Sequence, residues 1–303
     1  MSKLLLRLLA LCLFLPSPTV WSEPAEKLTI LSSIRPLTLL ATDLLEGLPV
    51  EIKTLLPASA DPHNWAMRVS DRQVLATADL VVWLGPDFEN FLAKPLRERP
   101  NAQLELGVLP GLHWPKAADH DHDHHGHHHH DHHHGGRDMH LWLNPANAIK
   151  VQAALVAKIA EQKPQWRAEL QQRLQRQTAQ LSQLQGDIQH RLASHQQTGF
   201  IAYHDAYGHF VDAFGLHQLA AVNQSAEQRL SAKALHQLQG QARNARCLLA
   251  EKNGNQEQRL AERLGLPLIV ADGLALDPQL QTFTDFLTQI TTAFEACASF
   301  VAE

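Results

Sequence analysis

Three histidines stand in settings where metal chemistry is plausible on residue type and position. They are His63 in an Asp-Pro-His motif, His140 in Met-His-Leu-Trp, and His204 in Tyr-His-Asp-Ala-Tyr. Each lies at the end of a run that favours a β-strand or in the loop after one. Ligands collect beyond the carboxyl ends of strands in open α/β sheets, so the three side chains can converge. One such histidine is more often a structural residue, but three in equivalent settings favour a metal site of neutral imidazoles.

A second concentration of histidines lies between His120 and His134, where eleven of the chain's twenty histidines are interrupted by aspartates. No packed core could bury so many polar rings with their nitrogens satisfied, so residues 119–138 are predicted to form a solvated, mobile loop. A His-rich tract is typical of metal binding. Because a flexible segment must be ordered at each capture, we expect weak, multiple zinc sites. Their ligands would be His120, His122, His124, His125, His127, His128, His129, His130, His132, His133 and His134.

The elements that position these residues alternate between short apolar strands and helices, which predicts an α/β fold with mainly parallel sheets. Strands are expected at 28–31, 50–55, 80–83, 200–203, 247–250 and 268–270. Helices are expected at 36–45, 70–78, 145–161, 207–214, 231–244, 256–264 and 279–299. The longest helical pattern begins at Pro164, with leucines and isoleucine spaced by three, four and seven to Leu192.

This pattern divides the chain into two βα lobes joined by one long, rigid helix, with a metal cleft between the lobes. The N-terminal lobe is predicted to span residues 23–163 and to carry the His/Asp loop. Residues 164–195 would form the connecting helix, and residues 196–303 the C-terminal lobe. The alternative for the connector is a long amphipathic helix packed on one lobe.

Residues 1–22 have the composition of a secretory signal peptide. Lys3 precedes an apolar stretch, Arg7 lies within it, and Ser22 is a small residue suited to the cleavage site. About a dozen apolar residues fall short of the roughly 20 that span a bilayer. Removal of this segment changes the formal net charge from −5 to −7, because it contains two basic and no acidic residues. An acidic, secreted chain argues against nucleic-acid binding.

The mature chain keeps two cysteines, Cys247 and Cys297. Disulfides persist in an exported protein, so the two could be bonded, or they could be buried free thiols.

Several motifs together resemble a known family. They are Leu-Pro-Ala-Ser-Ala-Asp-Pro-His at 56–63, Ala-Asp-Leu-Val-Val-Trp-Leu-Gly-Pro at 78–86, the internal His/Asp loop, His-Leu-Trp-Leu-Asn-Pro at 140–145 and Tyr-His-Asp-Ala-Tyr-Gly-His-Phe at 203–210. The chain closely resembles the periplasmic zinc-binding proteins of bacterial ABC importers, the ZnuA type. The resemblance covers essentially the whole mature chain, and the cysteine pair fits the disulfide of that family.

The resemblance implies a monomeric periplasmic protein that captures Zn²⁺ as cargo and passes it to a membrane permease driven by a separate ATPase subunit. By motif, the zinc ligands would be His63, His140 and His204, a set that suits Zn²⁺. Some members have a glutamate before the first histidine, where this chain has Pro62. The fourth ligand would then be water, a loop histidine or Asp277, and water is favoured. The loop would gather or sense zinc.

Other functions remain as alternatives. A manganese- or iron-binding importer subunit could use the same fold, although those metals usually take carboxylate ligands. A zinc chaperone or metal-dependent adhesin would need no importer. A secreted zinc hydrolase would also use three histidines and an open position, with Glu251 as the nearest candidate base. The sequence has no His-Glu-x-x-His motif, so we expect a binding protein and not an enzyme.

Overall fold

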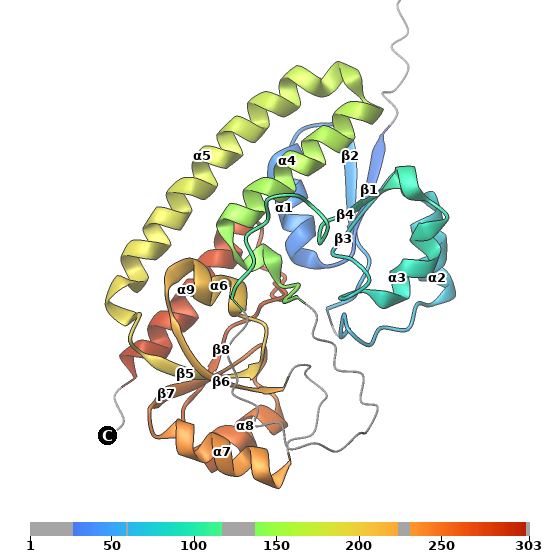
Figure 1. Ribbon diagram of the computed structural model, residues 1–303. Helices are drawn as coiled ribbons and strands as arrows, with labels where there is room; N and C mark the ends of the chain where they lie inside the picture. Colours follow the sequence, from blue (N-terminus) through green and yellow to red (C-terminus); the bar gives the residue numbers. More distant parts are fainter. Residues whose placement is uncertain (1–26, 59, 117–136, 224–230, 301–303) are drawn as a thin grey trace, which may run out of the picture.

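The computed structural model describes residues 27–58, 60–116, 137–223 and 231–300, which form two α/β lobes lying along one long helix (Figure 1). The predicted fold class is therefore confirmed. The predicted signal peptide and the eleven loop histidines lie outside the described residues. Within the described ranges, the helices include none with the length and apolar character needed to cross a membrane.

The N-terminal lobe is built on a four-stranded parallel sheet with the strand order β2-β1-β3-β4. Its strands are β1 (Leu28–Ser32), β2 (Val50–Thr54), β3 (Leu80–Trp83) and β4 (Gln103–Glu105). Its helices are α1 (Arg35–Leu45), α2 (Val69–Thr77), α3 (Asn90–Arg97) and α4 (Pro145–Gln162). The central strands β1 and β3 are almost wholly buried, as expected for parallel strands covered on both faces.

The C-terminal lobe repeats this plan with the strand order β6-β5-β7-β8, again all parallel. Its strands are β5 (Gly199–His204), β6 (His217–Asn223), β7 (Ala245–Ala250) and β8 (Leu268–Val270). Its helices are α6 (Gly208–Phe214), α7 (Ala232–Ala242), α8 (Asn255–Leu264) and α9 (Phe283–Ser299). A disulfide joins Cys247 of β7 to Cys297 of α9, so the alternative of two free thiols is wrong.

Helix α5 (Arg167–Leu192) is the long connector, and it runs beside both lobes (Figure 1). Its 26 residues span about 39 Å at the usual rise. It contacts α1 and α4 of one lobe and α9 of the other. The apolar residues predicted from its spacing include Leu170, Leu181, Ile188 and Leu192, and these four are buried. The connector is therefore packed along its length on both lobes.

The lobes also contact each other directly, and one core of buried residues extends from β1 to α9, while a smaller second core lies within the C-terminal lobe. Arg35 of α1 donates to the carbonyl of Leu280 at 2.7 Å, and the backbone N–H of Phe283 donates to Asp43 of α1 at 2.9 Å. Each bond crosses from the N-terminal to the C-terminal lobe. A buried polar group that loses its hydrogen-bond partner destabilises the folded state, so these contacts hold the two lobes in one relative position.

Three elements were absent from the sequence prediction, namely α3, β4 and β6. Helix α3 contains Pro95, which removes a backbone donor and disfavours a helix interior. Strand β4 has only three residues, and β6 is rich in alanine, which has low β-propensity. The missed elements lie at sheet edges or over the sheet, so their absence did not change the predicted architecture.

Candidate metal centre

The three predicted histidines meet between the lobes, each carried by a different kind of local structure. His204 is the last residue of β5, at the carboxyl end of a central strand. His63 lies in the turns that follow β2, and His140 directly precedes a 3-10 helix at Leu141–Leu143. One histidine therefore comes from the sheet of the C-terminal lobe and two come from loops of the N-terminal lobe.

Both loop histidines are held by the same short motif, an aspartate two residues earlier in the chain. The backbone N–H of His63 donates to Oδ1 of Asp61 at 2.9 Å, and that of His140 donates to Oδ1 of Asp138, also at 2.9 Å. Such Asp turns fix the backbone without regular secondary structure. The Asp-x-His spacing is thus a local signal for the position of each loop histidine.

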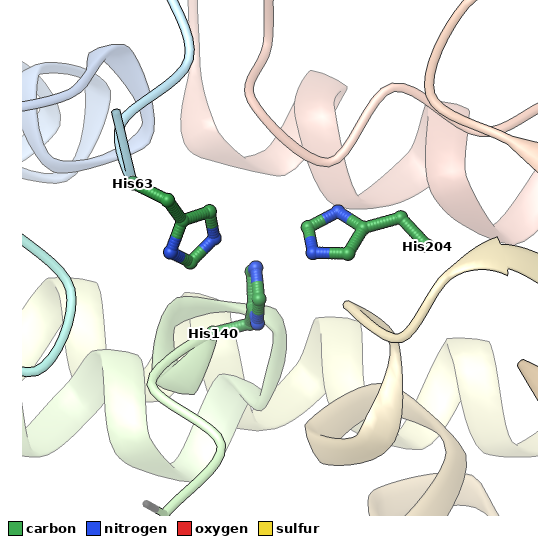
Figure 2. Close-up of side chains that lie close together, drawn as sticks. All are labelled: His63, His140 and His204. Carbon is green, nitrogen blue, oxygen red and sulfur yellow. The ribbon is translucent and has the colours of Figure 1, made fainter. Parts of the chain in front are cut away.

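The rings surround a common space, and one nitrogen of each ring faces it (Figure 2). The ring centroids are 5.2 Å apart for His140 and His204, 5.6 Å for His63 and His204, and 5.9 Å for His63 and His140. One ligand atom from each residue lies within 4.8 Å of the others. Tetrahedral zinc with Zn–N bonds near 2.0–2.1 Å needs nitrogens about 3.3 Å apart. A small inward movement of the rings would reach that geometry.

The surroundings of the three rings are aromatic and unequally open to solvent. His140 and His204 are only 6% and 4% exposed, whereas His63 is half-buried. Phe88 makes T-shaped contacts with two rings, with centroid distances of 4.6 Å to His63 and 5.3 Å to His140. Trp142 lies 5.2 Å from His140. These aromatic neighbours fix the ring positions and exclude water from one side of the space.

Burial and neighbouring groups set the protonation of the site. Burial, together with the nearby rings of His140 and His204, lowers the pKa of His63 to about 4. His63 is therefore neutral at physiological pH, as a metal ligand must be. Burial alone would lower the pKa of His204, but Glu251 more than offsets this effect and raises that pKa above its ordinary value.

Two carboxylates, whose side chains are 20% and 17% exposed, contact two of the rings on the side away from the common space. Oδ1 of Asp138 lies 2.7 Å from Nδ1 of His140, and Oε1 of Glu251 lies 3.2 Å from Nδ1 of His204. Burial raises the pKa of each carboxyl group, but the combined interactions with the nearby histidines outweigh it and leave the pKa below its ordinary value. Both are therefore anionic at neutral pH.

The other sequence expectations for the site have different outcomes. Asp277 is not in the described group of converging ligands, and its Oδ1 accepts from the backbone N–H of Gln279 at 2.9 Å. The last two residues of the predicted His/Asp loop lie within the described part of the chain. The guanidinium of Arg137 lies 5.0 Å from the ring centroid of Trp114, and Asp138 makes two contacts with His140. Sequence reasoning named Glu251 only as a candidate base and did not find the contacts of Asp138 or Phe88.

Known proteins resemble the chain along most of its length. The family model described as the periplasmic zinc-uptake complex component A, ZnuA, matches residues 30–297. The high-affinity zinc uptake system protein ZnuA of Yersinia pestis is 34% identical over 319 residues, covering 96% of this chain and 96% of that protein. The protein of the same name from Haemophilus ducreyi is 31% identical, covering 88% and 92%.

A solved structure agrees with this result at the level of the fold. A crystal structure of ZnuA superimposes with a TM-score of 0.73 at 20% identity, covering 90% of this chain and all of that one. The family match spans well over half of the sequence, and the relative in Yersinia pestis is similar from end to end. The chain therefore belongs to the ZnuA family, the periplasmic component A of zinc-uptake complexes.

Proposed function

We propose that this protein captures Zn²⁺ in the periplasm through His63, His140 and His204 and delivers it to the membrane permease of an ABC importer. The observation that carries the proposal is the convergence of three imidazoles from two lobes with no carboxylate among the grouped ligand atoms of the described residues. Zinc accepts such a nitrogen set readily, whereas manganese and iron sites usually include carboxylate oxygen. The all-histidine set thus favours zinc over the manganese or iron alternative.

A fourth ligand would complete the tetrahedron, and water is the choice that the surroundings support. Pro62 offers no side-chain donor, and Asp277 is engaged with its own turn. Glu251 faces Nδ1 of His204, so it is placed as a partner of a ligand and not as a base beside the metal. Under this proposal the chain is a binding protein and not an enzyme.

The remaining parts of the proposal concern export and partners. Residues 1–22 would direct the chain to the periplasm and be removed there. The chain has no Gly-x-x-x-x-Gly-Lys-Ser/Thr phosphate-binding loop, so the energy for transport would come from a separate ATPase. The protein would act as a monomer whose two lobes present the loaded site to the permease.

Zinc titration of the purified mature protein tests this function. We expect one tight zinc site in the wild type. In His63→Ala, His140→Ala and His204→Ala, the zinc affinity should fall by more than the roughly 100-fold that loss of an outer-shell partner costs. His217→Ala is the matched control, because His217 is exposed on β6. Equal zinc affinity in the control and in all three variants would overturn the assignment. A wild-type protein that binds Mn²⁺ more tightly than Zn²⁺ would overturn the choice of metal.

A further inference from the structure

We propose that Asp138 and Glu251, one carboxylate from each lobe, position His140 and His204 for zinc and balance its charge without coordinating it. This inference rests on the proposed function and concerns residues outside the ligand set. The two carboxylates are positioning residues, because each would act on the metal only through the ring that it contacts.

The contact between Asp138 and His140 is fixed from several directions. Oδ1 of Asp138 accepts from both the backbone N–H and the Nδ1–H of His140. The carbonyl oxygen of Asp138 accepts from Nε2 of His209 at 2.7 Å, and His209 belongs to α6 of the opposite lobe. A Cβ atom at Gly208 would lie 2.5 Å from Oδ2 of Asp138, so glycine is required there for the carboxylate to keep its place. Asp138 is therefore held by both lobes.

The contact between Glu251 and His204 is built on two neighbouring strands. Glu251 directly follows β7, which pairs with β5, and His204 ends β5. The side chains of Glu251 and His204 are 17% and 5% exposed, so the contact between them is shielded from solvent. The Cys247–Cys297 disulfide anchors the same strand β7 to α9. The sheet itself thus sets the distance between the carboxylate and the ring.

Each carboxylate lies beside Nδ1 of its histidine, at 2.7 Å for Asp138 and His140 and at 3.2 Å for Glu251 and His204, and so favours the other ring nitrogen for the metal. When Nδ1 donates its hydrogen to a carboxylate, Nε2 keeps a free lone pair. In Figure 2 the nitrogens of His140 and His204 that face the common space are those on the far side of each ring from Nδ1. Both rings therefore turn Nε2 toward the space between the three histidines.

The same two carboxylates also compensate the positive charge of the zinc ion, which three neutral histidine ligands do not. A dication in a buried site costs free energy unless nearby anions compensate it. Two carboxylates behind the ligands supply two negative charges, which match the charge of Zn²⁺. Since neither is a ligand, the three protein ligands remain nitrogens and the fourth position stays available to water.

The test uses Asp138→Asn and Glu251→Gln in the full mature protein, because each amide keeps the shape and removes the charge. We expect zinc affinity to fall 10- to 100-fold in each variant. The amide oxygen of Asp138→Asn can still accept from Nδ1, so this variant should bind zinc better than Asp138→Ala. Asp272→Asn is the control, because this buried carboxylate accepts from backbone N–H groups of residues 274 and 276 and touches none of the three rings.

Ring ¹⁵N NMR of the zinc-loaded protein provides a readout that general destabilisation would not change. We expect metal bonding at Nε2 and a proton on Nδ1 for both His140 and His204. Metal bonding through Nδ1 of either ring, or unchanged zinc affinity in both amide variants, would overturn the inference. If the amide variants bind normally while the three alanine variants of the histidines do not, this inference fails and the proposed function stands. If the wild type binds no zinc, the proposed function fails.

Discussion

The indole Nε1–H of Trp142 donates to the carbonyl oxygen of Gly273 at 2.8 Å, and this hydrogen bond joins the two lobes inside the core. Trp142 is fully buried, and its ring also lies 5.2 Å from His140. The side chain of Trp142 thus packs against the proposed zinc ligand His140 and also bonds to the C-terminal lobe, which carries His204. Lobe contact and ligand placement depend on the same residue.

Replacement of Trp142 should therefore weaken both the contact between the lobes and the placement of the proposed ligand His140. In Trp142→Phe the carbonyl of Gly273 loses its donor in a buried setting, and we expect the free energy of unfolding to fall by about 1–3 kcal/mol. Urea denaturation of the apo-protein measures this change, and zinc titration should show a parallel loss of affinity. Trp166→Phe is the matched control, because Trp166 is only partly buried and lies near the start of α5. A Trp142→Phe protein as stable as the control would contradict this account.

Two deletions that differ by two residues separate the His/Asp loop from the scaffold. Replacing residues 119–136 with a short Gly/Ser linker removes all eleven loop histidines but keeps Asp138, so we expect the weaker zinc sites to disappear and one tight site to remain. Replacing residues 119–138 also removes the partner of Nδ1 of His140, and zinc affinity at the tight site should fall by a further 10- to 100-fold. Calorimetric zinc titration measures both effects. Indistinguishable tight sites in the two deletions would show that Asp138 does not support the ligand.

Glu89 predicts a pH dependence of stability that is unrelated to zinc. Burial raises its pKa from 4.5 to about 7, although Oε2 accepts from the backbone N–H groups of Leu84 and Gly85. The folded state thus retains a proton that the unfolded chain releases. This contribution to stability is fully present below about pH 4.5, and it is lost as pH rises toward 7. The loss is on the order of 3 kcal/mol.

Glu89→Gln tests this dependence, because an amide cannot ionise and can still accept both backbone hydrogen bonds. We expect the variant to gain stability relative to the wild type between pH 5 and pH 8 by roughly the amount that ionisation costs. Urea denaturation at several pH values gives the comparison, and Glu98→Gln serves as the exposed control. A stability difference that stays constant with pH would refute the assignment.

The disulfide between Cys247 and Cys297 should contribute strongly to stability. It closes a loop with a sequence separation of 50, for which the chain-entropy model gives about 4 kcal/mol. We expect Cys247→Ala/Cys297→Ala to lower the free energy of unfolding by about that amount, as measured in urea. The wild type under strong reducing conditions should behave like the double variant. A reduced wild type with unchanged stability would contradict this prediction.

The convergence of His63, His140 and His204 could be predicted because each lies in a short recognisable motif, and their role as zinc ligands stays a prediction. Parallel sheets bring the carboxyl ends of their strands together, which accounts for His204 at the end of β5. His63 and His140 lie instead in loops, each held by an aspartate two residues earlier in the chain. The long connector was also predictable, since its apolar spacing marks one face of a helix over many turns. Both signals are local and repeat along the chain.

The supporting residues could not be predicted in this way, because their roles depend on contacts between distant segments. Glu251 contacts His204 only because β7 pairs with β5, and the backbone of Asp138 is held by His209 of the other lobe. Element ends were also missed where a cap decides them. Helix α9 begins at Phe283 and not at Gln279, because Thr282 and Asp285 form a capping box there.

The three histidines are unequally buried, so the proposed metal centre is closer to solvent on one side than on the other. His140 and His204 lie deep between the lobes, while His63 stands on a half-open loop of turns. The lobes are fastened to each other by hydrogen bonds around α1 and α9, so exchange of the ion depends on the side that already reaches solvent. We therefore expect zinc to enter and leave the site on the side of His63. His140 and His204 should be the first residues to bind the ion tightly and the last to release it.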